Sequence, residues 1–268
     1  MRTTTATPGA SSIESVTGRL VPIVRDIARG GLAGLLTGFL VAGIGGRLVM
    51  RAAALAMPAA TGRFTENGNA IGEITAGGTF ALLVGGTFVG LMGAVLWTVV
   101  SPWLPGGPRT RALLAAGCAV ALTGVALVQG SNPDFQILRH DRLTVGLLML
   151  LVACAGLSIS LFDSWLERRL PPAGSSSSSD AAYFLLTVLG AGLVLPPVVA
   201  ACLGQELALG LAIATIGAVT LVGWAFRYKA VPAPSWLQPA ARAALLVTVV
   251  LGFFALGPNV IRAAGLGE

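Results

Sequence analysis

Residues 143–162 read LTVGLLMLLVACAGLSISLF and contain no charged side chain. Residues 207–226 and 243–261 are likewise free of charge. A helix of about 20 residues spans roughly 30 Å, which is the thickness of the hydrocarbon core of a bilayer. Because backbone polar groups in lipid must be satisfied within their own segment, such stretches predict transmembrane helices.

The composition of the whole chain agrees with a membrane protein. Of its 268 residues, 55% are hydrophobic and 10% are charged, and the mean hydropathy is +0.84. Soluble domains carry about 25% charged residues. We therefore predict an all-α fold, a polytopic transmembrane helix bundle with seven spans. These spans lie approximately at 30–50, 78–100, 112–130, 143–162, 181–203, 207–226 and 243–261.

The positive charges divide unevenly between the two sides that seven spans would create. Of the 17 Lys and Arg residues, eleven fall on the side of the N-terminus and six on the other side. Cytoplasmic loops are enriched in Lys and Arg, so this bias predicts a cytoplasmic N-terminus and an external C-terminus. The net charge of +6 is thus expected to attract the anionic headgroups of membrane lipids. We expect no nucleic-acid partner.

All five tryptophans fall at the predicted cytoplasmic ends of the spans. They are Trp97, Trp103, Trp165, Trp224 and Trp236. Indole prefers the headgroup boundary, where its ring lies in apolar surroundings and its N–H is hydrated. A wrong span count would scatter these residues over both sides, so their distribution supports the predicted topology.

The spans define one domain with a polar extension. Residues 1–29 are predicted to form a polar cytoplasmic tail, and residues 30–262 a single transmembrane domain. Apolar residues at helical spacing in the tail could form an interfacial helix on the inner membrane surface. Pro22 interrupts this pattern, so two short helical pieces are expected rather than one. Residues 171–179, PPAGSSSSS, predict a solvated, disordered linker between the fourth and fifth spans.

The first span carries small residues at an unbroken spacing of four. They are Gly30, Gly34, Gly38, Ala42 and Gly46. On a helix this spacing makes a strip along which a neighbouring backbone can approach closely. We expect packing against the second span, whose own glycines repeat the spacing. A second copy of the chain or a partner membrane protein could also bind through Gly30, Gly34, Gly38 and Gly46.

The residue types that most membrane-embedded chemistry needs are missing from the predicted spans. The only histidine, His140, lies in a loop, which excludes haem ligation by paired histidines. The only lysine, Lys229, also lies in a loop and leaves no Schiff-base residue for retinal. The three cysteines have no paired spacing, and no phosphate-binding loop is present. We therefore expect no cofactor, no metal and no catalytic residues, and the chain is not predicted to be an enzyme.

The predicted external side carries one candidate site. Arg47 and Arg51 are spaced i, i+4 on one helix face, and Glu66 and Glu73 follow in the adjacent loop. These residues could form ion pairs that close the loop over the bundle, or hold an anionic ligand or lipid headgroup. Alternatively, both arginines simply extend their side chains to water at the end of a span.

A second candidate is the Pro196-Pro197 pair inside the predicted fifth span. Two prolines remove two backbone donors, so they predict a kinked or unwound helix. Broken helices form substrate sites in many transporters. No charged residue accompanies this pair within the span, which fits a structural kink equally well.

No motif in the sequence is specific to a characterised family. Sixteen of the 17 basic residues are arginine, which is typical of GC-rich bacterial coding. We interpret the chain as an integral, multi-pass protein of a bacterial inner membrane, with membrane lipids as partners and a non-catalytic structural or interaction role. The alternative is a small transporter or channel for a neutral or weakly charged solute. That alternative requires Pro196 and Pro197 to line a water-filled cavity.

Overall fold

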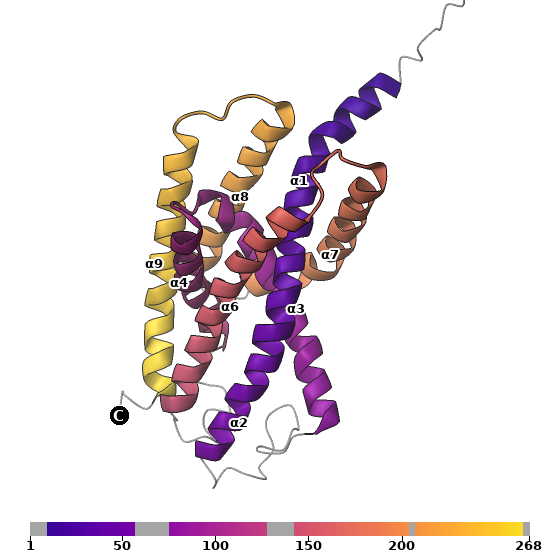
Figure 1. The fold of residues 1–268 in the computed structure, drawn as a ribbon. Coiled ribbons are helices and arrows are strands. Elements are labelled where there is room, and N and C mark those ends of the chain that lie inside the picture. Colours follow the sequence, from indigo (N-terminus) through magenta and orange to yellow (C-terminus); the bar gives the residue numbers. More distant parts are fainter. Residues whose placement is uncertain (1–9, 57–74, 128–141, 204–206, 265–268) are drawn as a thin grey trace, which may run out of the picture.

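The computed structural model describes residues 10–56, 75–127, 142–203 and 207–264, and all regular secondary structure in these ranges is helical. In chain order the helices are α1 (Ala10–Thr37), η1 (Gly38–Gly45), α2 (Gly46–Ala56), α3 (Ala76–Val100), η3 (Ser101–Trp103), α4 (Pro108–Leu127), α6 (Arg142–Arg169), α7 (Ser177–Leu203), α8 (Leu207–Lys229) and α9 (Leu237–Ala263). Figure 1 shows a bundle in which the start of α1 and the end of α9 lie at opposite ends.

The first helix is much longer than a single predicted span. α1, η1 and α2 follow one another without interruption from Ala10 to Ala56. The expected break at Pro22 is wrong, because α1 continues through this residue. A proline inside a helix removes one backbone hydrogen bond. Burial of the flanking segment offsets this cost, since Val24 packs with Ala28 of the same helix and Tyr183 of α7.

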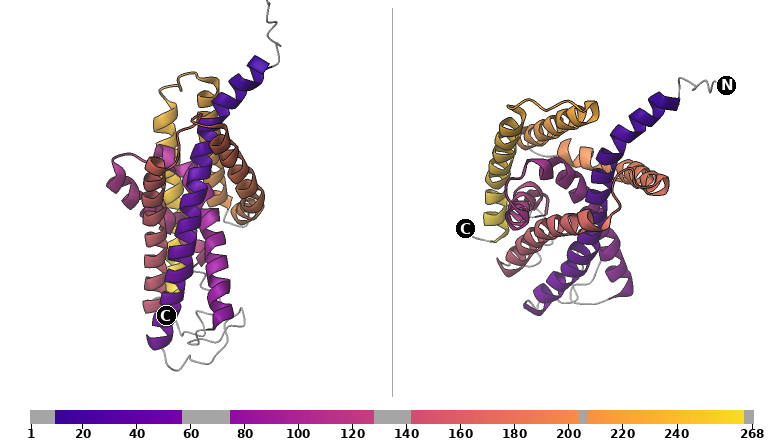
Figure 2. Two further views of the ribbon diagram at one scale, coloured as in Figure 1. Left: turned by 45° about the vertical axis from the view of Figure 1, so that its right-hand side comes forward. Right: turned by 45° about the horizontal axis from the view of Figure 1, so that its top comes forward.

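The long first helix forms the middle of the bundle. Both views of Figure 2 show α1 between α6 and α7, and α1 packs against both of them and against α3. On the other side of α6, α4 packs against both α6 and α9, and α9 packs against α8. The largest core cluster joins α1, α3, α4, α6, α8 and α9 and includes Ala33, Trp97, Ile159 and Leu245.

α1 and α3 approach each other backbone to backbone. A Cβ atom on Gly34 would lie 2.5 Å from the carbonyl oxygen of Gly90, and one on Gly38 would lie 2.5 Å from that of Gly86. Real Cβ atoms essentially never come closer than 3.0 Å to another heavy atom. These four positions therefore require glycine at the observed helix separation.

The strip of small residues does not follow the predicted spacing of four to its end. After Gly38, both Ala42 and Gly43 contact α3, because the carbonyl carbon of Ala42 and the N of Gly43 lie 2.9 Å and 2.5 Å from a Cβ built on Gly86. A Cβ on Gly46 would meet nothing within 4 Å. The reason is that η1 is a π-helix, in which hydrogen bonds join residues i and i+5 and each turn is wider than in an α-helix. The wider turn changes the register of the strip, so that Gly43 joins Ala42 at the contact with α3 and Gly46 leaves it.

Five helices in the described part of the chain are long and apolar enough to cross a membrane. They are Gly18–Ala56, Ala76–Trp103, Arg142–Arg169, Ser177–Pro197 and Leu237–Ala263. α4 and α8 lie at the predicted third and sixth spans but are not among these five. Large apolar side chains point outward, for example Phe80 and Phe254, which are 68% and 76% exposed. The length and the apolar surface of the helices indicate a multi-pass membrane protein.

The serine run between α6 and α7 is not the disordered linker that the sequence predicted. α7 begins inside the run at Ser177. The Oγ of Ser176 accepts a hydrogen bond from the N–H of Ser179 at 3.2 Å, as a residue preceding a helix commonly does. The carboxylate of Asp180 accepts a further bond from the N–H of Gly174 at 3.1 Å, and Gly174 has a left-handed φ of +78°. Serine and aspartate thus start a helix here.

Candidate functional site

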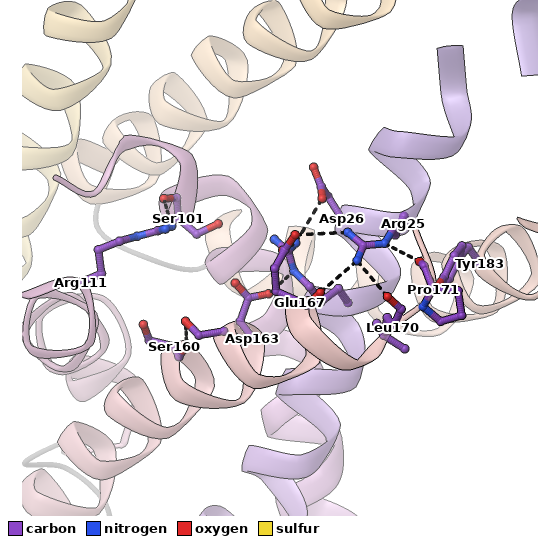
Figure 3. Close-up of polar contacts among 12 residues, drawn as sticks. Arg25, Asp26, Ser101, Arg111, Ser160, Asp163, Glu167, Leu170, Pro171 and Tyr183 are labelled. Atoms are coloured by element: carbon purple, nitrogen blue, oxygen red, sulfur yellow. Dashed lines mark hydrogen bonds and ion pairs between the residues drawn. The ribbon is translucent and has the colours of Figure 1, made fainter. Parts of the chain in front are cut away.

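Six charged side chains from three helices meet near the C-terminal end of α6. Figure 3 labels four of them, Arg25, Asp26, Asp163 and Glu167. This charged cluster consists of Arg25, Asp26 and Arg29 of α1, Asp163 and Glu167 of α6, and Arg227 of α8. The two arginines of α1 are spaced i, i+4, and so are the two acidic residues of α6. This spacing places each pair on one helix face, so that α1 presents cations to the carboxylates of α6.

Arg29 is the centre of the charged cluster. Its Nε donates to Oδ1 of Asp163 at 2.7 Å, and its Nη1 lies 3.4 Å from Oδ1 of Asp26. The same guanidinium contacts the carboxylate of Glu167. The side chains of Arg29 and Asp163 are only 15% and 9% exposed. Because a buried charge is costly unless it is paired, this contact holds α1 and α6 in one relative position.

Arg25 closes the C-terminal end of α6. Its Nε donates to the carbonyl oxygen of Pro171 at 2.9 Å, and its Nη2 donates to those of Glu167 and Leu170, both at 3.2 Å. The last carbonyl groups of a helix have no partner within the helix, so a guanidinium satisfies them well. Tyr183 of α7 donates its hydroxyl to the same Pro171 carbonyl at 2.9 Å. Arg25 and Tyr183 therefore connect α1, α6 and α7.

Arg227 adds α8 to the charged cluster. Its Nη2 lies 2.8 Å from Oδ2 of Asp26. The two side chains are 49% and 30% exposed, so water screens this pair far more than the pair of Arg29 and Asp163. An exposed ion pair contributes at most about 1 kcal/mol. The stabilising part of the cluster is thus the contact between α1 and α6.

A cavity of about 170 Å³ lies beside the charged cluster. Its lining residues come from several helices and are Asp26, Ile27, Arg29, Gly30, Trp97, Thr98, Ser101, Pro102, Arg111, Asp163, Trp224 and Arg227. Nη2 of Arg111 donates to the carbonyl oxygen of Ser101 at 2.7 Å. Nε of Arg111 and Nε1 of Trp97 are buried and have no hydrogen-bond partner within the described residues. Buried hydrogen-bond donors without an acceptor are rare in folded proteins. Two of them belong to residues that line this cavity.

A buried hydrogen bond connects η3 to α8 close to this cavity. Nε1 of Trp103 donates to Oγ1 of Thr220 at 2.8 Å. Oγ1 of Thr220 lies 2.9 Å from the carbonyl oxygens of both Val99 and Ile216, one of which accepts its single proton. Thr220 is 1% exposed, so Trp103 has no access to water in place of this acceptor.

Thr220→Val is expected to destabilise the protein by about 1–3 kcal/mol, because it leaves the Trp103 N–H buried without an acceptor. Thermal unfolding of the purified protein in detergent measures the loss. Thr215→Val in the same helix is the matched control, since this exposed hydroxyl only donates to the carbonyl oxygen of Leu211. Equal losses of stability for the two variants would contradict the structural role of the Trp103–Thr220 bond.

Two residues of the candidate site on the predicted external side, Arg47 and Arg51, lie at the opposite end of the bundle from the charged cluster. Arg47 and Arg51 belong to α2, whose position Figure 1 shows. Arg47 is partly buried and Arg51 is exposed. Glu66 and Glu73 lie outside the described residues, so their ion pairs with the two arginines stay a prediction.

The second candidate site, at Pro196 and Pro197, lies within α7. The helix is continuous from Ser177 to Leu203 across both prolines, so it is not unwound there. Pro196 is exposed, Pro197 is partly buried, and neither lines the cavity beside the charged cluster.

Sequence reasoning did not predict the charged cluster. Its acidic residues on α6 follow the apolar run that ends at Phe162, and its residues on α1 precede the run that begins at Gly30. Both groups therefore lie in polar segments outside the predicted spans. The sequence does contain a signal for it. Two arginines on one segment and two acidic residues on another are each spaced i, i+4, and both segments are predicted to lie on the same side of the membrane.

The described residues contain no group of three or more His, Cys, Asp or Glu side chains that could hold a metal ion. The features from which a role can be inferred are therefore the charged cluster and its cavity. Comparison with known proteins gives no match among family models, curated proteins or solved structures.

Proposed function

We propose that the chain is a multi-pass protein of a bacterial inner membrane with a non-catalytic, structural or interaction role. The observation that carries this proposal is the charged cluster. Its acids and arginines contact one another and connect α1, α6 and α8. The carboxylate of Asp163 accepts from Arg29 at 2.7 Å and so connects α6 to α1. This chemistry favours helix assembly over catalysis.

The position of the charged cluster along α1 supports a membrane boundary at this level. Arg29 and Arg47 are separated by 18 residues of continuous helix, which corresponds to about 27 Å. This length is close to the roughly 30 Å of a hydrocarbon core. The two arginines thus bracket an apolar segment, and the excess of basic residues on the side of Arg29 supports a cytoplasmic location for the charged cluster.

Seven spans with the N-terminus inside predict opposite outcomes for two reporter fusions. A fusion after Gly174 is expected to report the cytoplasm, and a fusion after Glu268 the external side. The helices α4 and α8 lie at the third and sixth predicted spans and support the number seven. Fusions that both report the same side would contradict it.

An interaction role implies a partner helix or a second copy of the chain. The sequence suggests contact through Gly30, Gly34, Gly38 and Gly46. The first three contact α3 of the same chain, whereas Gly46 keeps open space for a partner. A partner at this position is expected to be lost on Gly46→Leu, and the mass of the purified complex in mild detergent measures the loss.

A transporter for a neutral or weakly charged solute is the second candidate function. The cavity of about 170 Å³ beside the charged cluster favours it, because ion pairs between three helices could close a pathway at this end. The pathway would then follow this cavity and not Pro196 and Pro197, which do not line it. Proteoliposome swelling with a series of neutral solutes distinguishes the two functions. A transporter would give solute-dependent swelling that changes on Arg29→Gln. A structural protein would swell no faster than empty liposomes.

A further inference from the structure

Two residues that line the cavity beside the charged cluster each carry a buried hydrogen-bond donor without an acceptor. Trp97 of α3 is 6% exposed, and its Nε1 has no partner within the described residues. Nε of Arg111 in α4 is also buried and has no hydrogen-bond partner within the described residues. Both groups can only donate, because neither an indole nor a guanidinium N–H accepts a hydrogen bond. A ligand that satisfies them must therefore present acceptor atoms.

The charges that line the cavity select the sign of such a ligand. Asp163 is paired with Arg29, and Asp26 with Arg227. Arg111 has no acidic partner among the described residues, and its Nη2 bonds instead to a neutral backbone carbonyl. The lining thus carries three arginines and two aspartates, an excess of one positive charge. A group with one negative charge would balance it.

We propose that this cavity binds a phosphate group. Phosphate oxygens accept from a planar guanidinium with favourable geometry, and the indole N–H of Trp97 supplies a further donor. Cavities of about 150 Å³ hold a molecule as large as benzene, so a volume of about 170 Å³ admits a phosphate group. The group belongs either to a phospholipid headgroup or to inorganic phosphate. Headgroup phosphates lie at the level that tryptophans prefer, and two tryptophans line this cavity.

Binding of two probes to the delipidated, full-length protein in detergent tests this proposal. Inorganic phosphate and phosphatidylglycerol are titrated separately, and heat of binding is recorded. Trp97→Phe keeps a ring and removes the donor, so it is expected to weaken binding about tenfold. Arg111→Gln removes the charge and is expected to weaken binding about a hundredfold. Trp236→Phe and Arg109→Gln are matched controls, because both residues are exposed and lie outside the cavity lining.

The outcomes separate the source of the phosphate group from the existence of the site. Binding of inorganic phosphate that both cavity variants weaken identifies a site for the free anion. Binding of phosphatidylglycerol alone, weakened in the same way, identifies a lipid site. Failure of the parent to bind either probe overturns the proposal, and so does equal affinity in the cavity and control variants. If Arg111→Gln does not fold, the affinity of Trp97→Phe still tests the proposal. This variant removes no hydrogen bond of the described structure and is therefore expected to fold. The reporter fusions test the membrane topology independently of this result.

Discussion

Gly90→Ala is expected to destabilise the bundle by about 3 kcal/mol. The added Cβ would lie 2.3 Å from both the carbonyl oxygen of Gly34 and the Cα of Gly38. Overpacking typically costs about 1–3 kcal/mol. We expect the upper end of this energy range, because the obstructing atoms belong to the backbone and cannot rotate away. α1 and α3 would have to separate, which thermal unfolding in detergent would report as a lower Tm.

Gly93→Ala is the matched control for this effect. It places the same substitution in the same helix, three residues later, where a Cβ would meet nothing within 4 Å. Alanine favours an α-helix over glycine by about 0.5–1 kcal/mol, so Tm should stay constant or rise slightly. A common Tm for the two variants would show that close backbone contact does not stabilise the pair of helices.

Arg29→Ala is expected to cost about 3–5 kcal/mol, because it leaves the buried carboxylate of Asp163 without a cation. The double variant with Asp163→Ala should lose less than the sum of the two single variants, since it removes both charges together. Chemical unfolding of all four proteins completes this double-mutant cycle and gives the coupling energy.

Arg227→Ala provides the comparison for the buried pair. It breaks an ion pair with Asp26 in which both side chains are much more exposed, so the loss should stay below about 1 kcal/mol. High salt should reduce this smaller loss and leave most of the larger one. Equal costs for Arg29→Ala and Arg227→Ala would refute the structural importance of the buried contact.

Apolar runs located the helices well, but not the ends that extend beyond the apolar segment. The predicted span 78–100 corresponds to α3, Ala76–Val100, and 207–226 to most of α8. By contrast, α6 continues for seven residues past Phe162, and α1 begins at Ala10 instead of residue 30. Hydropathy detects the part of a helix that lies in lipid. Hydropathy does not detect charged turns at the ends of a helix, and the residues of the charged cluster lie in such turns.

The glycine strip shows a second limit of sequence patterns. A constant spacing of four assumes a regular α-helix throughout the first span. The π-helical turn between Gly38 and Gly45 changes the phase, so that Gly43 contacts α3 and Gly46 does not. Nothing in the local sequence GFLVAGIG requires this conformation. The all-helical architecture is confirmed, whereas the number of spans and the ion pairs of Arg47 and Arg51 with Glu66 and Glu73 stay predictions.

The charged cluster also has a consequence for synthesis of the chain. Arg29 and Asp163 are 134 residues apart, so a ribosome that adds about 5–20 residues per second needs roughly 7–27 s to supply the partner. Until α6 is made, Arg29 has no partner on that helix. Asp26, three residues before Arg29, can serve as its counter-ion as soon as one helical turn exists. Arg227, which is made 201 residues after Asp26, then binds that carboxylate last. The nascent first helix thus carries its own neutralising group until the later helices arrive.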